Sequence, residues 1–147
     1  MDIITYEEED LLPGVILDKN AGKFEIYGKS CPVDGIEFYE PIFNWFDQYK
    51  NDPLERTNLD FKLTYFNTIS AKVILKLMTK MEDLSNLGHE VKIRWYYTEG
   101  DEELEEAGEK FANIVNVNFE YIPVCNNESQ QIDESEFENL MDELFKL

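Results

Sequence analysis

Several short segments of the chain alternate apolar and polar residues with a period of two, as half-buried β-strands do. A stretch between the first two segments, KNAG, contains Asn20 and Gly22 and suits a tight turn. We therefore expect the first two strands to form a hairpin. The pattern predicts five strands in all, at residues 15–18, 23–28, 61–66, 91–97 and 117–122.

The segment FKLTYF (61–66) shows what this alternation implies for a single strand. Successive side chains of a strand point to opposite faces of the sheet. One face is expected to be apolar and the other mixed, with Phe61, Leu63 and Tyr65 on the first and Lys62, Thr64 and Phe66 on the second.

Between the strands, apolar residues recur at the three- and four-residue spacing of amphipathic helices. This spacing predicts helices at residues 36–50, 70–84 and 101–115. Asp34 and Glu37 could form a capping box for the first helix. Pro41 then kinks that helix, or the helix starts near Glu40. The acidic start of the third helix complements the helix dipole.

The predicted order is β-β-α-β-α-β-α-β. Strands of parallel sheets that carry helices on both faces are apolar throughout, whereas the predicted strands alternate. We therefore expect an α/β two-layer sandwich, in which helices cover one face of a mixed β-sheet and the other face is largely polar.

The last part of the chain differs in composition from the rest. Residues 126–136, NNESQQIDESE, have the composition of a linker. The segment SEFENLMDELFKL (135–147) follows and predicts an acidic amphipathic helix, which packs on its own domain or docks to a partner. We expect a domain at 1–124, with the linker and helix at 125–147. The apolar stripe of the helix comprises Phe137, Leu140, Met141, Leu144 and Phe145.

Composition and charge narrow the classes of function. The 147 residues are 43% hydrophobic and include ten Phe, eight Tyr and two Trp, which is enough to bury a core. The net charge is −19, with 32 acidic and 13 basic residues, so neither nucleic acid nor an anionic membrane is expected as a partner. An acidic N-terminus and the lack of an apolar run of about 20 residues indicate a cytoplasmic protein.

The sequence carries little catalytic chemistry. The two cysteines, Cys31 and Cys125, form no CxxC motif, and His89 is the only histidine, so no metal site is predicted. G-x-S-x-G, P-loop and GxGxxG motifs are all missing, and no cofactor is implied. The cluster GDEELEE lacks the ligand pattern of a calcium loop and is interpreted as a solvated helix start. We expect a protein that is not an enzyme.

The most informative site is YFNTISAK (65–72), where a predicted strand meets a predicted helix. Exposed backbone N–H groups and the helix dipole at such a junction favour an anion. Asn67, Thr68 or Ser70 could each cap the helix, or a hydroxyl could accept a phosphate. Spacing alone does not decide between these two interpretations.

Three stretches together resemble the SiaC family of bacterial regulatory phosphoproteins. They are GKSCPVDGIEFYEPIFNWFDQY (28–49), FKLTYFNTISAK (61–72) and WYYTEGDEELEEAGEKF (95–111), and the resemblance spans about residues 11–123. It implies a fold like that of STAS-type anti-sigma factor antagonists. It also implies a partner switch, in which a dedicated kinase phosphorylates the Thr of an N-T-S-S motif and a PP2C-type phosphatase removes the phosphate. The unphosphorylated form then binds and activates a diguanylate cyclase.

On this chain the resemblance places the phosphoacceptor at Thr68, with Ser70 as the second choice. Asn67, Ile69, Ser70 and Lys72 would form, with Thr68, the surface that kinase, phosphatase and target contact. The chain departs from the family pattern because N-T-S-S reads Asn67-Thr68-Ile69-Ser70 here. The acceptor is kept, although the partner surface could differ.

Two other hypotheses remain open. The chain could be a constitutive acidic adaptor or chaperone-like module that docks through its C-terminal helix. It could also be a small hydrolase that uses scattered carboxylates, although abundant Glu makes that signal unspecific.

Overall fold

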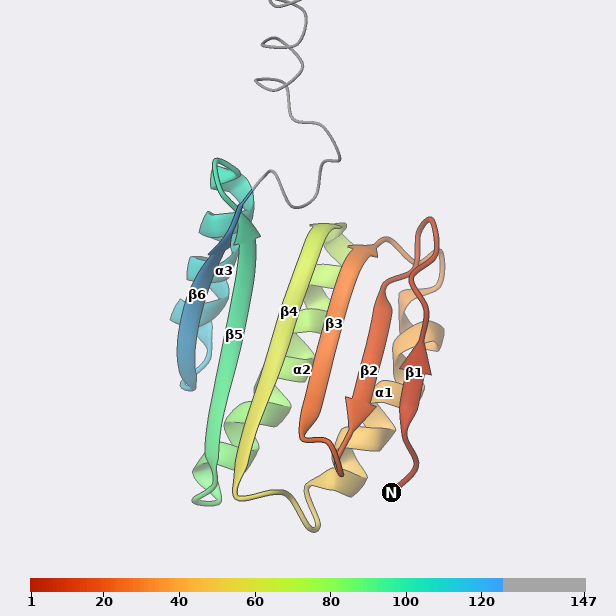
Figure 1. Cartoon of the computed structure of the whole chain (residues 1–147), viewed down its shortest axis with the longest axis vertical. Coiled ribbons are helices and arrows are strands. Elements are labelled where there is room, and N and C mark those ends of the chain that lie inside the picture. Colours follow the sequence, from red (N-terminus) through yellow and green to blue (C-terminus); the bar gives the residue numbers. More distant parts are fainter. Residues whose placement is uncertain (126–147) are drawn as a thin grey trace, which may run out of the picture.

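Six strands form one mixed sheet, and three helices lie on one of its faces (Figure 1). The structure is a computed structural model that describes residues 1–125, so most of the predicted linker and the whole predicted C-terminal helix lie outside the described residues. The elements in chain order are β1 (Ile4–Tyr6), β2 (Gly14–Asp18), β3 (Lys23–Ser30), α1 (Gly35–Tyr49), β4 (Arg56–Phe66), α2 (Thr68–Asn86), β5 (Glu90–Thr98), α3 (Glu102–Ile114) and β6 (Asn118–Val124).

The connections explain why the helices share one face. The strands lie in the order β1-β2-β3-β4-β5-β6, with β1 to β3 antiparallel and β3 to β6 parallel. Each parallel crossover moves to the next strand in the same direction. Because such crossovers are almost always right-handed, α1, α2 and α3 fall on the same side of the sheet. The predicted two-layer sandwich with a mixed sheet is confirmed.

Two strands differ from the sequence prediction. The strand β1 was missed because its three residues precede an acidic run, yet Ile4 and Tyr6 pair with β2 and pack against the core. The strand β4 begins at Arg56, five residues earlier than expected. Its first half looks polar, but Thr57 is buried and its hydroxyl lies 2.7 Å from the Tyr49 hydroxyl.

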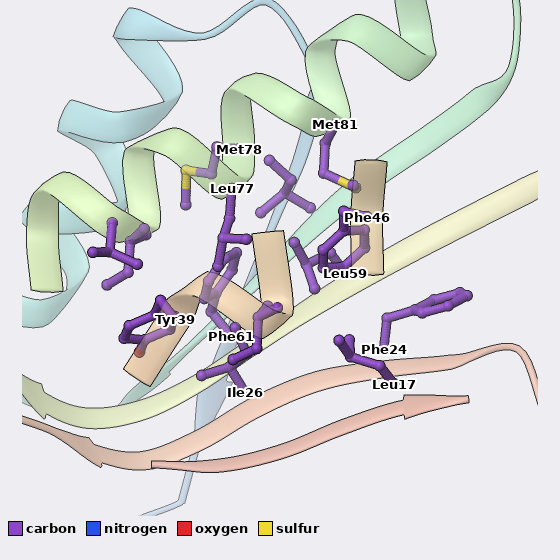
Figure 2. Close-up of a cluster of buried hydrophobic side chains, with 14 of the residues drawn as sticks. Leu17, Phe24, Ile26, Tyr39, Phe46, Leu59, Phe61, Leu77, Met78 and Met81 are labelled. Atoms are coloured by element: carbon purple, nitrogen blue, oxygen red, sulfur yellow. The ribbon is translucent and has the colours of Figure 1, made fainter. Parts of the chain in front are cut away.

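The core lies between the helices and one face of the sheet (Figure 2). In the view, Phe24, Ile26 and Phe61 from the strands lie opposite Leu77 and Met78 from α2. The helix α1 contributes an aromatic row to the same layer, comprising Tyr39, Phe43, Trp45, Phe46 and Tyr49.

Each helix starts at a side-chain cap. For α1, Asp34 Oδ1 accepts a hydrogen bond from Glu37 N at 3.1 Å, so the helix begins at Gly35 and includes Pro41 rather than starting near Glu40. For α3, Asp101 Oδ1 accepts from Leu104 N at 3.0 Å. The acidic cluster at the start of α3 is therefore accounted for by a capped helix start.

The end of β4 contains a bulge that changes which side chains face the core. Gly28 pairs with Leu63 but Lys29 pairs with Tyr65, so β4 has one extra residue at this point. The extra residue reverses the alternation. Phe66 packs against Trp95 with ring centroids 6.0 Å apart, whereas Tyr65 is 55% exposed. The prediction that Tyr65 shares the face of Phe61 and Leu63, with Phe66 on the opposite face, was wrong.

The other face of the sheet is polar, as the alternation predicted, and it carries ion pairs between neighbouring strands. Asp60 on β4 accepts two hydrogen bonds from the Arg94 guanidinium on β5, one of them at 2.7 Å. Glu25 on β3 lies 3.2 Å from Lys62 Nζ on β4. Paired charges keep this face polar while the opposite face forms the core.

Candidate functional site

The junction between β4 and α2 lies at the edge of the sheet where the parallel strands end (Figure 1). Asn67 joins the two elements with an extended backbone conformation, φ −92° and ψ 179°. Its Oδ1 accepts a hydrogen bond from Ser70 N at 2.8 Å, and its own N–H donates to Ser30 O at 3.2 Å. Asn67 is therefore the N-cap, and α2 starts at Thr68 instead of Ser70 as predicted.

Ser70 belongs to an interior hydrogen-bond network. Its side chain is fully buried, and its Oγ donates to Ser30 O at 2.7 Å. The same Oγ lies 2.7 Å from Ser30 Oγ, which in turn lies 2.7 Å from the Tyr39 hydroxyl. The Tyr39 hydroxyl can donate to Ser30 Oγ, Ser30 Oγ to Ser70 Oγ, and Ser70 Oγ to Ser30 O, so each hydroxyl has a hydrogen-bond partner. The network ties together β3, α1 and the start of α2.

Burial of Tyr39 affects its ionisation. Loss of water contact raises the pKa of the Tyr39 hydroxyl to about 12, and the hydrogen bond with Ser30 opposes this increase. The hydroxyl is therefore protonated at neutral pH and can act as the first donor of the network.

Thr68, Ile69 and Lys72 lie on the surface, whereas Asn67 is half-buried and Ser70 is not accessible. The predicted five-residue contact surface is thus split. Neither the cap nor the interior network uses the Thr68 hydroxyl, because Asn67 and Ser70 supply those bonds. In this conformation neither a kinase nor a partner could reach the Ser70 hydroxyl, and the structure corrects that part of the prediction.

A groove of about 940 Å³ runs between α1 and α2 and begins beside Thr68. Two of its apolar side chains are strongly exposed, Val33 at 91% and Ile36 at 71%, and Ile69 is 46% exposed. We call this feature the α1–α2 groove. Its lining residues are Val33, Asp34, Ile36, Glu40, Phe43, Asn44 and Asp47 on one side and Ile69, Lys72, Val73, Lys76 and Lys80 on the other.

Sequence reasoning missed this groove. The available signal was two large apolar residues, Val33 just before the helix predicted at 36–50 and Ile36 at its first position. Which α2 residues would face them depended on how the two helices pack, so the pattern could not identify the opposite wall.

Three lysines, spaced four residues apart, form much of the α2 wall of the groove. Lys80 pairs with Asp47 across the groove. Lys76 Nζ lies 4.4 Å from the centre of the Phe43 ring, a cation–π contact. No ion pair involves Lys72 or Lys76 within residues 1–125. The groove can therefore accept a segment that is both apolar and acidic.

The described part of the chain offers little other chemistry. No cluster of three or more His, Cys, Asp or Glu in residues 1–125 is arranged to hold a metal ion. None of the described helices combines the length and apolar character needed to cross a membrane.

Comparisons with known proteins agree with this architecture. A family model described as "SiaC family regulatory phosphoprotein" matches residues 6–124. A Pseudomonas aeruginosa protein described as uncharacterized is 28% identical over 99 residues, which cover 67% of this chain and 79% of that protein.

Two solved structures show the same fold. SiaC of Pseudomonas aeruginosa superposes with a TM-score of 0.77 at 24% identity, covering 84% of this chain and 100% of that chain. A chain in the crystal structure of the diguanylate cyclase SiaD in complex with its activator SiaC, from the same species, gives a TM-score of 0.78 at 24% identity. That match covers 82% of this chain and 99% of the other.

Proposed function

Because the chain belongs to the SiaC family of regulatory phosphoproteins, we propose that it is a non-enzymatic partner switch with Thr68 as its phosphoacceptor. A cognate kinase phosphorylates Thr68, and a PP2C-type phosphatase removes the phosphate. The unphosphorylated form binds a target, which we take to be a diguanylate cyclase, since the related SiaC is described as the activator of SiaD.

The observation that carries this proposal is the division of roles at the junction. Asn67 caps α2 and Ser70 completes the interior network, while the Thr68 side chain is exposed at the first residue of the helix. Capping therefore accounts for Asn67 but leaves the Thr68 hydroxyl free for a kinase.

A phosphate at Thr68 fits the physical setting of a helix start. It would add about −1.5 to −2 charges at pH 7, next to backbone N–H groups that favour an anion. Lys72 lies one turn further along α2, so it can pair with the phosphate. The fold can accept the modification without local unfolding.

The same phosphate would change what a partner meets. Thr68 is adjacent to Ile69, which lines the α1–α2 groove. A target that packs on Ile69 and the exposed Val33 and Ile36 would have to remove water from the phosphate. Otherwise the target would have to place its own side chains against the added charge. Both outcomes disfavour the complex, so phosphorylation releases the target.

The first experiment is phosphate transfer from the cognate kinase, followed by peptide mapping by mass spectrometry. We expect phosphate on the wild-type peptide that contains Thr68 and none there in Thr68→Ala. Thr79→Ala is the matched control, because Thr79 is an exposed threonine on the same helix. Transfer to Thr68→Ala at the wild-type level would overturn the assignment.

The second experiment measures binding to the cyclase. Wild type, Thr68→Glu and the phosphorylated protein would be compared by calorimetry. We expect the two negatively charged forms to bind at least about tenfold more weakly than the wild type, because like charges or a buried charge at an interface cost several kcal/mol. Equal affinity of Thr68→Glu and wild type would rule out this mechanism.

A further inference from the structure

We propose that residues 133–147 of this same chain bind in the α1–α2 groove. The segment lies beyond the family match, which ends at residue 124, and outside the described residues. The proposal does not require Thr68 to be the phosphoacceptor.

The groove exposes apolar side chains, and their burial under a bound segment would be favourable. Val33, Ile36 and Ile69 are large aliphatic side chains, all well exposed, and they gather at the same end of the groove. Grouped apolar side chains on a surface mark a binding site more often than scattered ones do. The apolar stripe predicted for 135–147 presents side chains of the matching kind, at the spacing of one helix face.

Charge favours the same occupant. Residues 126–147 contain seven carboxylates and one lysine. On the α2 wall, Lys72 and Lys76 have no ion-pair partner among residues 1–125. The α1 wall carries Asp34 and Glu40, so the acidic side of the segment would face α2.

The end of the described chain lies within reach of the groove. The strand β6 ends at Val124, and because β4 and β6 are parallel, this is the edge where β4 ends and α2 begins (Figure 1). Two strand spacings separate β4 from β6, or about 10 Å. Residues 126–132 can span about 23 Å when extended, more than twice this separation, and α2 begins directly after β4, at Thr68.

The length of the predicted helix also matches the length of the groove. The helix predicted at 135–147 would be about 20 Å long, and the groove is lined by α2 residues from Ile69 to Lys80, a rise of about 17 Å. The segment can therefore lie along the groove, with its first turn near Ile69 and its last near Lys80.

Docking of the segment would control whether a partner can reach the surface beside Thr68. A tethered segment has an effective concentration of the order of millimolar, so a partner that uses the same groove must displace it. This consequence rests on the proposed function, whereas the docking does not.

The test uses the full chain, without kinase or target. A zero-length carbodiimide cross-linker joins carboxylates to amines that are in direct contact. An equal mixture of unlabelled and ¹⁵N-labelled chains separates links within one chain from links between chains. We expect links within one chain, from Lys72 or Lys76 to carboxylates of residues 133–147. Links only between chains, or none despite coverage of both peptides, would overturn the proposal.

A matched pair of variants tests whether the apolar stripe drives the docking. Leu140→Asp places a charge in the stripe, and Asn139→Asp places the same charge one residue away, outside it. Neither position is among the core residues of the described part, 1–125. We expect the Lys72 and Lys76 links to fall at least about fivefold in Leu140→Asp and to persist in Asn139→Asp, since burying a charge in an apolar contact is unfavourable. Equal yields in the two variants would contradict docking in the groove.

Discussion

Adding the same negative charge at position 68 or at position 70 should have opposite effects on stability. Thr68→Asp places a carboxylate on the surface at the first residue of α2, whereas Ser70→Asp places it in the interior network. The two positions are two residues apart in the sequence. The comparison therefore asks whether burial decides which hydroxyl can carry a phosphate.

The expected magnitude at position 68 is small and favourable. A carboxylate in the first turn of a helix is stabilised by about 0.3–1 kcal/mol through the helix dipole. A pair with Lys72, four residues on, contributes roughly 0.2–0.5 kcal/mol. We expect Thr68→Asp to raise the free energy of unfolding by about 0.5–1.5 kcal/mol.

At position 70 the change is large and unfavourable. The Ser70 hydroxyl donates to Ser30 O at 2.7 Å, and a carboxylate cannot donate this bond. Ser30 O keeps the hydrogen bond from Asn67 N–H, but a buried carboxylate without a cationic partner costs several kcal/mol. We expect Ser70→Asp to lower the free energy of unfolding by at least about 3 kcal/mol, a large part of the roughly 5–15 kcal/mol typical of a domain.

The assay is urea denaturation at pH 7, followed by circular dichroism. Thr68→Asn and Ser70→Asn are the neutral controls, because Asn has nearly the shape of Asp without its charge. The reasoning would be refuted if Ser70→Asp stayed within about 1 kcal/mol of Ser70→Asn, or if Thr68→Asp were clearly less stable than Thr68→Asn.

Three further predictions concern the residues around the site. Burial raises the pKa of Tyr39 from 10 to about 12, so as the pH rises above 10 this side chain ionises first in the unfolded chain and the folded state loses stability. Between pH 8 and 11 this group accounts for a loss of about 1.4 kcal/mol in the free energy of unfolding. We expect this loss to be absent in Tyr39→Phe when urea denaturation is measured at both pH values. Asn67→Ala should lower stability by about 1 kcal/mol through loss of the cap, and Asn67→Ser should largely keep it; equal losses in the two variants would argue against the cap. Gly108→Ala would place a Cβ 2.5 Å from Trp95 Cδ1; we expect about 1–3 kcal/mol of destabilisation and a changed tryptophan emission, and unchanged stability would show that the contact can relax.

The sequence predicted the helices and most strands because local patterns reflect which face of an element is buried. Alternation located the strand that became β5, and the acidic start at Asp101 marked the beginning of α3. The strand β1 was too short and too close to an acidic run to be recognised. The bulge near Tyr65 was also invisible, since it arises from the pairing of β4 with β3.

By itself, the sequence determined that a strand meets a helix at residues 65–72 and that three hydrogen-bonding side chains lie there. It could not distinguish among Asn67, Thr68 and Ser70, because each can cap a helix. Only the tertiary structure separated their roles, since Ser70 is buried against Ser30, forty residues earlier in the chain. The α1–α2 groove likewise depends on two helices packing side by side, and no pattern within one segment encodes which residues of another segment will face it.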